Sequence, residues 1–405
     1  MITSFFALFL SVILLQLSSG GVGPLDALSG IKLEFSTQQI GMLGSAHFLG
    51  FFIGCWWAPR LMGSVGHSRT FATFTAAGAI GLLAHMMLVD AYAWALMRVA
   101  SGMCMAGCYT VIEAWLNARV TNENRGRAMG SYRIVDTGAS LMAQLLVAVL
   151  EPADYLSYNL LAICCCASLL PLTLTQTSQP ETPDAPRLRP GLAWTCSPLA
   201  VAGVMAAALS SASFRMVGPI YGENVGLQNE QIAYFLAAFV AGGAIAQYPV
   251  GWIADKYDRR WVLIGLSVAA IFSCGITVLA STGGTSTVMA AAVLFGLTTF
   301  PIFSVSAAHA NDFATNEQRV ELSAALMFFF ALGAIASPYA TSTLITIFGP
   351  PALFAFIAAS HLILIIFSLI RMRRRASMTV RTPYIYIPRS SFTIGSLLNK
   401  LRDRD

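Results

Sequence analysis

The chain has 405 residues, of which 56% are hydrophobic and only 11% are charged. Soluble domains carry roughly 25% charged residues, so a soluble chain of this composition would have too few polar residues to cover its surface. The composition excludes large soluble domains, disordered chains and ordinary soluble enzyme folds, and it predicts a polytopic helical membrane protein. The net charge of +5 is spread between apolar runs and forms no basic patch, so we expect no nucleic-acid partner.

Twelve apolar runs of about 20 residues, separated by glycine, proline or charged residues, predict twelve transmembrane helices. In chain order the runs cover residues 4–24, 38–60, 70–90, 92–118, 126–149, 155–175, 195–220, 230–252, 260–281, 286–309, 320–345 and 350–371. Prolines and polar residues in Gln176–Pro190 indicate a linker. We therefore predict an N-terminal six-helix half over 1–175, a cytoplasmic linker over 176–193, a C-terminal six-helix half over 194–371 and a basic cytoplasmic tail over 372–405.

The basic residues are sorted along the chain. If both termini are cytoplasmic, most of the 24 Lys and Arg residues lie on the cytoplasmic side, and the outer loops hold only Lys32. Positive charge in short loops marks the cytoplasmic side of a membrane protein. We therefore expect a multi-pass, monomeric protein of the cell inner membrane with both termini in the cytoplasm. We expect its basic tail to bind anionic headgroups.

The two halves repeat one another. The segment Asn117-Ala-Arg-Val-Thr-Asn-Glu-Asn-Arg125 returns 194 positions later as Asn311-Asp-Phe-Ala-Thr-Asn-Glu-Gln-Arg319. Val22-Gly-Pro returns 195 positions later as Val217-Gly-Pro. Two parallel six-helix repeats are a transporter architecture, and they predict a substrate site between the halves near the middle of the membrane.

A loop after the eighth span reads Gly251-Trp-Ile-Ala-Asp255-Lys-Tyr-Asp258-Arg259-Arg260. It resembles the signature loop of the major facilitator superfamily, Gly-x-x-x-Asp-(Arg/Lys)-x-Gly-(Arg/Lys)-(Arg/Lys). The resemblance implies a twelve-helix fold and a gating role in which Asp255 and Arg259 latch the outward-facing state. Gly251 would permit close helix contact, and Arg259 and Arg260 would form charge pairs at the cytoplasmic face. Asp258 departs from the family pattern, which has glycine at this position.

Other segments refine the resemblance. In the equivalent loop of the first half, Pro59 and Gly63 replace the family's Gly and Asp, so that latch is degraded. The family element Arg-x-x-x-Gly is present as Arg98-Val-Ala-Ser-Gly102, and in proton-coupled members this arginine is associated with proton transfer. The Gly-Pro signature of antiporters is absent from the fifth span, which argues against drug antiport. Two segments resemble the uncharacterised YcaD-like bacterial branch: Glu113-Ala-Trp-Leu-Asn117 and Ala308-His-Ala-Asn-Asp312.

Ionisable residues at membrane depth are costly unless they are paired or line a cavity, and they mark candidate functional sites. Four candidates for proton coupling or a central cavity are Arg98, Glu113, Arg133 and Asp136. Glu113 and Arg133 lie at similar distances from the loop that joins their antiparallel helices, so they can pair. Such a pair is either a structural salt bridge or part of a proton-coupling site in which a carboxylate loads and releases a proton.

Polar residues at helical spacing indicate candidate substrate contacts, which are Tyr109, Thr137, Ser140, Gln144, Ser211 and Arg215. Three arginines against two carboxylates at membrane depth favour an anionic or zwitterionic solute. We expect Asp26 at the outer mouth, His47 and His85 as packed residues, and His309 in a local cap or loop network.

We predict a secondary transporter of a small organic solute that works by rocker-switch alternating access and is coupled to protons. A proton-linked multidrug exporter is the alternative within transport, and a non-transporting membrane scaffold is the alternative from another class. The chain has no phosphate-binding loop, metal-ligand cluster or nucleophile constellation, so we expect no cofactor, no metal and no enzymatic activity.

Overall fold

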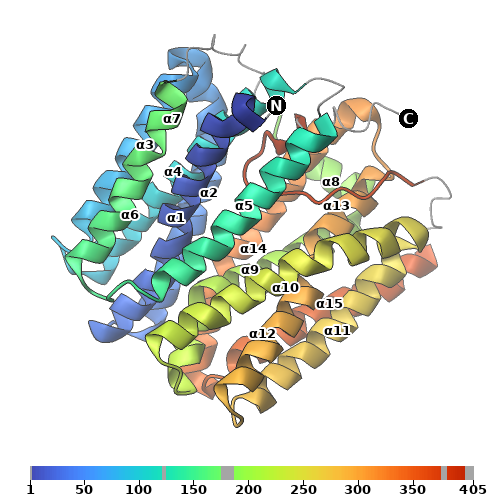
Figure 1. Cartoon of the computed structure of the whole chain (residues 1–405). Coiled ribbons are helices and arrows are strands. Elements are labelled where there is room, and N and C mark those ends of the chain that lie inside the picture. The colour runs from blue at the N-terminus through green and yellow to red at the C-terminus, as the bar shows by residue number, and fades with distance from the viewer. Residues whose placement is uncertain (1, 121–124, 175–186, 375–380, 397–405) are drawn as a thin grey trace. The chain divides into compact units, whose positions relative to one another are not determined.

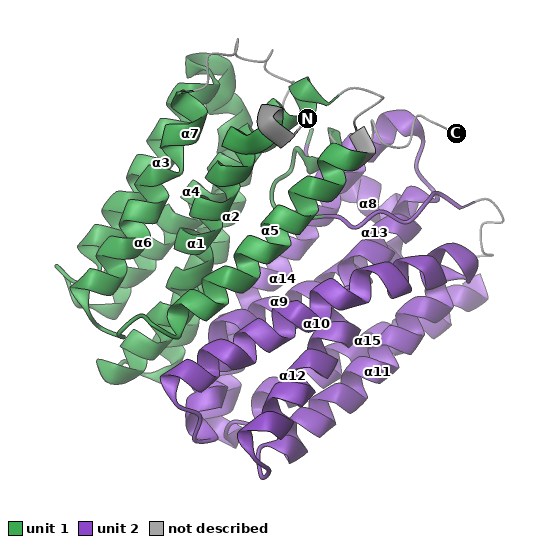
Figure 2. Ribbon diagram, viewed as in Figure 1, with its two compact units in different colours: residues 1–187, 388–405 green, residues 188–387 purple. Residues whose placement is uncertain are grey.

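The computed structural model describes residues 2–120, 125–174, 187–374 and 381–396, and within these ranges the chain is helical with no β-strand (Figure 1). The chain forms two compact units (Figure 2). The N-terminal unit comprises residues 1–187 and 388–405, and the C-terminal unit comprises residues 188–387. The end of the tail thus belongs to the N-terminal unit, although it follows the last helix of the C-terminal unit in sequence.

In the N-terminal unit the helices are α1 (Ile2–Lys32), α2 (Thr37–Val65), α3 (His67–Ala84), α4 (Ala91–Arg119), α5 (Arg125–Val147), α6 (Tyr155–Ala167) and α7 (Leu169–Thr173). In the C-terminal unit they are α8 (Pro190–Cys196), α9 (Pro198–Asn224), α10 (Asn229–Lys256), α11 (Arg259–Ala280), α12 (Thr285–Thr299), α13 (Ile302–Asn311), the 3₁₀ helix η1 (Asn316–Gln318), α14 (Arg319–Phe348) and α15 (Ala352–Arg374).

Every predicted span coincides with a helix or a pair of consecutive helices. Ten of the described helical segments are long and apolar enough to cross a membrane. The remaining spans are α3 and α5, which carry more polar residues. The first span is longer than predicted, because α1 contains Pro24 in its interior and continues to Lys32. The tenth span consists of α12 and α13, which meet at Pro301.

Close packing of α2 against α4 depends on two glycines. A Cβ atom on Gly50 would lie 2.0 Å from the carbonyl oxygen of Val99, and one on Gly102 would lie 2.0 Å from that of His47. No real side chain tolerates such distances, so glycine allows the two backbones to touch. Small residues serve this purpose in membrane helices, where close van der Waals packing drives helix association.

The same arrangement returns in the C-terminal unit. A Cβ atom on Gly242 of α10 would lie 2.1 Å from the carbonyl oxygen of Val293, and one on Gly296 of α12 would lie 2.1 Å from that of Phe239. Gly102 and Gly296 are separated by the 194 residues of the sequence repeat. The repeat is therefore structural as well as sequential.

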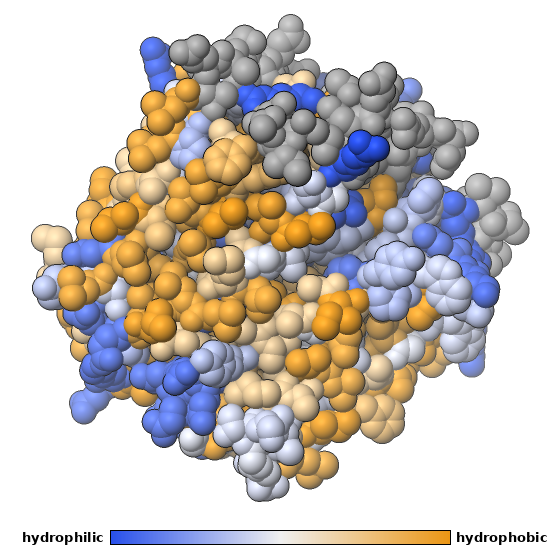
Figure 3. Space-filling model, viewed as in Figure 1, coloured by the Kyte–Doolittle hydropathy of each residue, from blue (hydrophilic) through white to orange (hydrophobic). Residues whose placement is uncertain are grey.

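The outward faces of the helices are apolar. Large hydrophobic residues such as Leu96, Ile134 and Ile163 expose 62–75% of their surface. On the face drawn in Figure 3, hydrophobic side chains cover most of the helical surface, with hydrophilic ones gathered toward its margins. Apolar patches of this size are expected where lipid covers the protein.

Candidate functional site

A cluster of buried polar residues surrounds Asp26 of α1 in the N-terminal unit. Asp26 and Arg98 of α4 are each only 1% exposed, and Nε of Arg98 lies 3.4 Å from Oδ2 of Asp26. Nε2 of His85 lies 3.5 Å from the same oxygen, and the Tyr158 hydroxyl donates to Oδ1 at 2.9 Å. We name Asp26, His85, Arg98 and Tyr158 the Asp26 cluster.

Hydrogen bonding in the Asp26 cluster is incomplete. Within the described ranges, none of the three guanidinium nitrogens of Arg98 forms a hydrogen bond, and neither does Oδ2 of Asp26. Buried polar groups nearly always find partners, so those that lack one need an explanation. A buried ion pair with long contacts also contributes little net stability. The Asp26 cluster therefore leaves several donors and one acceptor unsatisfied within the described residues.

His85 is held in place by a backbone carbonyl oxygen and an aromatic ring. Its Nδ1 lies 2.6 Å from the carbonyl oxygen of Gly81, which can only accept, so Nδ1 carries a hydrogen. Nε2 therefore has a hydrogen to donate to Asp26 only when the imidazole is protonated. The ring stacks on Tyr158 with centroids 5.0 Å apart, which keeps Nε2 directed at the carboxylate.

Glu113, near the other end of α4, is also buried, with 1% exposure. The Ser390 hydroxyl donates to Oε1 and the Ser391 hydroxyl to Oε2. The Tyr132 hydroxyl of α5 lies 3.5 Å from Oε1. These partners of Glu113 are hydroxyls, two of them from the tail; the Glu113–Arg133 pair stays a prediction. We name the surroundings of Glu113 and Tyr132 the Glu113 site.

Asp136 of α5 lies one helical turn beyond Tyr132. Its Oδ1 accepts from the Tyr109 hydroxyl of α4 and from Nε2 of Gln16 of α1, the latter at 2.9 Å. Two turns further along α5, Nε2 of Gln144 donates to the Gly20 carbonyl oxygen of α1 at 3.2 Å. Asp136 and Gln144 of α5 therefore contact α1, and Asp136 also contacts α4.

The remaining candidate contacts lie in both units. On α5, Thr137 is half-buried and Ser140 is 6% exposed. On α9 of the C-terminal unit, Ser211 is 6% exposed and donates to the Ala207 carbonyl oxygen within its own helix. Arg215, one turn later, is half-buried. Their role as substrate contacts stays a prediction.

The signature loop of the C-terminal unit centres on Arg259, which is 1% exposed. Its Nη1 donates to Oδ1 of Asp312 at 2.6 Å and to the Ala308 carbonyl oxygen at 3.0 Å. Its Nη2 donates to Oδ1 of Asp255 at 3.2 Å. Arginine suits this position because its planar fork can donate in several fixed directions at once.

The first part of the tail, residues 381–387, lies against this loop. The Thr382 amide donates to Oδ1 of Asp312 at 2.8 Å, and the Tyr384 amide donates to Oδ1 of Asp255 at 2.6 Å. A Cβ atom on Gly251 would lie 2.6 Å from the ring of Tyr384. Gly251 was expected to permit close contact between helices, and in the structure it makes room for the tail.

Asp258 replaces the family's glycine without disrupting the turn. It caps α11, and its carboxylate accepts from the backbone and the side chain of Arg260. Burial by itself raises the pKa of Asp258, but hydrogen bonds from Arg260 and the charges of Arg260 and Arg381 outweigh it and lower the pKa below its ordinary value. Arg260 therefore stabilises the start of α11.

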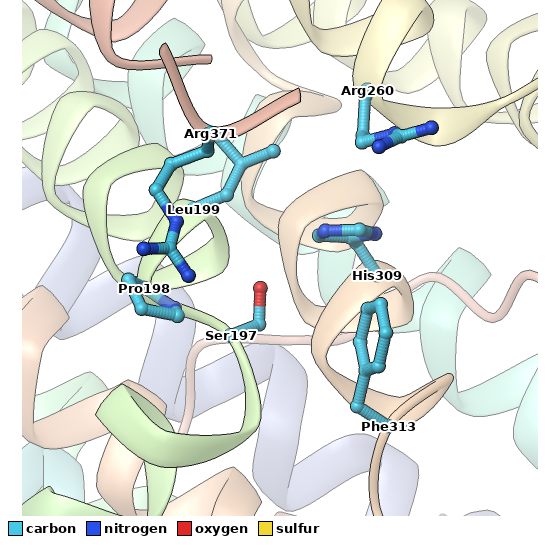
Figure 4. A pocket seen from close by; sticks show the side chains of 7 residues that line it. All are labelled: Ser197, Pro198, Leu199, Arg260, His309, Phe313 and Arg371. Atoms are coloured by element: carbon cyan, nitrogen blue, oxygen red, sulfur yellow. The ribbon is translucent and has the colours of Figure 1, made fainter. Parts of the chain in front are cut away.

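A small pocket in the C-terminal unit is lined by Ser197, Pro198, Leu199, Arg260, His309, Phe313 and Arg371 (Figure 4). Figure 4 shows the guanidinium of Arg371 directed toward Ser197 and Pro198, with His309 and Phe313 across the pocket. No acidic side chain is among these residues, so the lining chemistry suits an anionic group. Of the seven, the predictions gave a functional role only to Arg260.

Several predicted features lie partly outside the described residues. These are residues 121–124 of the repeated loop, residues 175–186 of the linker, and residues 375–380 and 397–405 of the tail. His85 is packed, as expected, against Trp94 and Tyr158. Asp26 was expected at the outer mouth, yet it is only 1% exposed and lies inside α1, which continues past Pro24 to Lys32.

Comparison with known proteins agrees with this architecture. The family model of the Major Facilitator Superfamily matches residues 7–193 and 199–401. An uncharacterized MFS-type transporter of Enterobacter sp. (strain 638) is 27% identical over 358 residues, which cover 87% of this chain and 91% of the relative. YcaD, an uncharacterized MFS-type transporter of Escherichia coli O7:K1 (strain IAI39 / ExPEC), is 27% identical over 353 residues, which cover 86% and 90%.

Solved structures show the same fold. The nucleoside transporter NupG has a TM-score of 0.74 at 14% identity and covers 91% of this chain and 99% of its own. A D-xylose-proton symporter has a TM-score of 0.64 at 13% identity and covers 91% and 97%. These comparisons confirm the predicted all-α transporter fold. The chain belongs to the Major Facilitator Superfamily and is a multi-pass membrane transporter rather than an enzyme.

Proposed function

We propose that this transporter couples the movement of a small polar organic solute to protons by rocker-switch alternating access. The observation that carries the proposal is the presence of three carboxylates inside the helices of the N-terminal unit: Asp26, Glu113 and Asp136. Intramembrane carboxylates are expensive, and in transporters they mark proton relays and substrate paths.

The Asp26 cluster and the Glu113 site lie toward opposite ends of α4. Arg98 and Glu113 are fifteen residues apart on this helix, which corresponds to about 22 Å along its axis. Asp136 is bound through Tyr109, which is one turn from Glu113. A proton acceptor near each end, with a third carboxylate beside one of them, supports proton exchange with both sides of the membrane as access alternates.

The balance of charge points to the class of solute. The preference for an anionic or zwitterionic solute depends on three arginines against two carboxylates, and the burial of Asp26 beside Arg98 adds a third carboxylate. Because the three arginines and three carboxylates then balance, we propose that the solute is a zwitterionic metabolite rather than a simple anion. Arg133 and Arg215 stay candidate partners for its acidic group, and Glu113 and Asp136 for its basic group.

We further propose that the protein is a monomer in a bacterial inner membrane, with both termini in the cytoplasm. The distribution of basic residues supports this orientation, and the curated relatives are bacterial proteins. Cysteine-labelling of single-cysteine variants at each terminus from either side of intact cells would test it.

Transport measured in proteoliposomes tests the coupling. Neutralising variants Asp26→Asn, Glu113→Gln and Asp136→Asn should abolish uptake driven by a pH gradient, whereas at least one should keep solute counterflow. The matched control is Glu151→Gln, because that carboxylate is 67% exposed and pairs with Lys32 at the surface. Full gradient-driven uptake by all three variants would refute proton coupling through these residues.

The solute panel should include zwitterionic metabolites, simple anions and lipophilic cations. Flux restricted to lipophilic cations would support the multidrug exporter instead. Absence of flux for every solute, together with tight association with another protein, would support the scaffold.

A further inference from the structure

The second part of the tail occupies the Glu113 site. Within the N-terminal unit, Ser390 and Ser391 donate to the two carboxylate oxygens of Glu113. The Phe392 ring packs edge-on against Phe52 of α2, with centroids 5.9 Å apart. Ser391, Phe392 and Ile394 are no more than 3% exposed. A side chain that hydrogen-bonds a buried carboxylate while its neighbour fills an apolar surface behaves as a bound ligand does.

The tail holds this conformation by its own hydrogen bonds. The hydroxyls of Ser391 and Thr393 lie 2.8 Å apart, the Thr393 amide donates to the Ser391 hydroxyl at 3.2 Å, and the Ser396 amide donates to the Thr393 carbonyl oxygen at 2.9 Å. Residues 390–396 therefore form a compact turn that presents two adjacent hydroxyls. Its order lowers the entropy cost of binding.

Glu113 cannot remain buried and ionised without the hydroxyls of Ser390 and Ser391. A buried carboxylate is stable only when donors compensate for the loss of water. If the tail withdrew, the described side-chain donors to Glu113 would reduce to the Tyr132 hydroxyl at 3.5 Å. Whatever replaces the tail must therefore supply hydrogen-bond donors or a proton, and a simple carboxylate ion would be repelled.

We propose that residues 390–394 are a built-in competitor for the solute, and that the solute carries paired hydrogen-bond donors next to an apolar group. The ammonium group of a zwitterion and the neighbouring hydroxyls of a polyol share this donor chemistry. That the competing ligand is a transported solute rests on the proposed function, but occupation of the Glu113 site by the tail can be measured without transport.

The direct test uses the purified full-length chain and a capped peptide with the sequence of residues 389–395. In the Ser390→Ala/Ser391→Ala variant the intramolecular competitor is weakened, and the peptide should raise the apparent melting temperature. At the same peptide concentration, the rise in apparent melting temperature should be at least tenfold smaller for the unaltered chain, because its own tail is present at high effective concentration. Ser396→Ala is the matched control, because its hydroxyl donates to the Thr393 carbonyl oxygen of the tail and not to Glu113, and this variant should behave as the unaltered chain.

Two further arms make the outcome decisive. Glu113→Gln added to the double-serine variant should reduce peptide binding at least tenfold, and a peptide with alanine at both serine positions should not bind. Equal peptide binding with and without Glu113→Gln, or no binding to the double-serine variant while it remains monodisperse, would overturn the proposal.

Binding of small solutes then shows which donor group replaces the tail hydroxyls at Glu113. Binding of an apolar amino acid, an aromatic diol and a matched carboxylate without donors is compared between the double-serine variant and the unaltered chain. The variant should bind the amino acid or the diol at least tenfold more tightly, and the carboxylate unchanged. If the peptide competes but no solute is transported by either protein, the proposed function fails while the occupied site stands. Identical solute affinities in both proteins would refute competition by the tail.

Discussion

The two units share one helical frame but have opposite interiors. In both, paired glycines bring the second and fourth spans into backbone contact. The interior of the N-terminal unit holds Asp26, Glu113 and Asp136 in the body of its helices. In the described part of the C-terminal unit, every carboxylate lies in a loop, in the 3₁₀ helix or in the first or last turn of an α-helix.

The difference holds position by position. Residues 194 positions after Arg98, Glu113 and Asp136 are Ala292, Ala307 and Phe330, and the residue 195 positions after Asp26 is Tyr221. All four are buried. The same frame therefore holds carboxylates at these positions in one unit and none at the equivalent positions in the other.

The C-terminal interior is dominated by aromatic packing. Phe214 has four aromatic neighbours, and its ring lies 4.5 Å from that of Phe239 and 5.0 Å from that of Phe295. Aromatic pairs in these arrangements add to the stability gained from burial. The C-terminal unit also carries the more complete of the two signature loops, at the end of α10.

Removing Asp26 should produce the largest contrast between the units. Asp26→Asn leaves the guanidinium of Arg98 buried without its carboxylate, and losing one partner of a buried ion pair costs about 3–5 kcal/mol. The equivalent change in the C-terminal unit, Tyr221→Phe, removes one hydrogen bond to the Thr277 carbonyl oxygen and should cost about 1 kcal/mol. Unfolding of both variants in detergent measures the difference.

The control is the double variant Asp26→Asn/Arg98→Gln, which should be more stable than Asp26→Asn because no buried charge remains unpaired. If Asp26→Asn unfolds no more readily than Tyr221→Phe, the contrast between the two interiors is wrong.

The signature loop should show the next largest effect. Asp312→Asn weakens charge-assisted hydrogen bonds from the buried Arg259 and should cost about 1.5–3 kcal/mol. Asp255→Asn should cost less, because the Asp255 side chain is 48% exposed. Arg259→Lys should not preserve stability, since an ammonium group cannot reproduce the fork. Thermal unfolding and proteolysis of the tail report both changes, and equal losses for Asp312→Asn and Asp255→Asn would contradict the ranking.

A smaller effect is expected at Asp136. Tyr109→Phe deletes the hydroxyl that donates to its carboxylate, and hydrogen bonds between membrane helices are worth about 0.6–1.7 kcal/mol. Tyr92→Phe is the control, because that ring is 68% exposed. Denaturant unfolding in mixed micelles should separate the two variants. A stability change for Tyr92→Phe as large as for Tyr109→Phe would remove the support for a polar contact in the interior.

Asp258 should give the smallest effect and a defined pH dependence. Its pKa is lower in the folded protein than its ordinary value of 3.8, so it stabilises the fold above that value. The contribution is lost as the pH falls through the lowered folded pKa. Between about pH 5 and pH 3, Asp258→Asn should therefore lose less stability than the unaltered chain. Parallel acid-dependence curves for the two proteins would show that Asp258 contributes nothing.

Much of the candidate site follows from the depth of charged residues in apolar runs. Arg98, Glu113 and Asp136 stand out because ionisable side chains are rare within membrane helices. Asp26 did not, because Gly23-Pro24 resembles the end of a span, whereas Pro24 lies within α1. His85 gave no signal, since a lone histidine in an apolar helix is more often packed than functional. The partners of Glu113 were beyond reach, because Ser390 and Ser391 follow it by more than 270 residues.

The sequence by itself determined that the chain is a multi-pass helical membrane protein with two repeated segments and a family signature loop. These properties depend on local hydrophobicity and on residue spacing, which survive any rearrangement of the helices. The tertiary structure decided that Arg98 pairs with Asp26 on α1 and that Tyr384 fills the space left by Gly251. It also decided that the tail compensates Glu113 with two hydroxyls. Such contacts depend on the rotation of each helix and on the path of the tail, and neither leaves a periodic trace in the sequence.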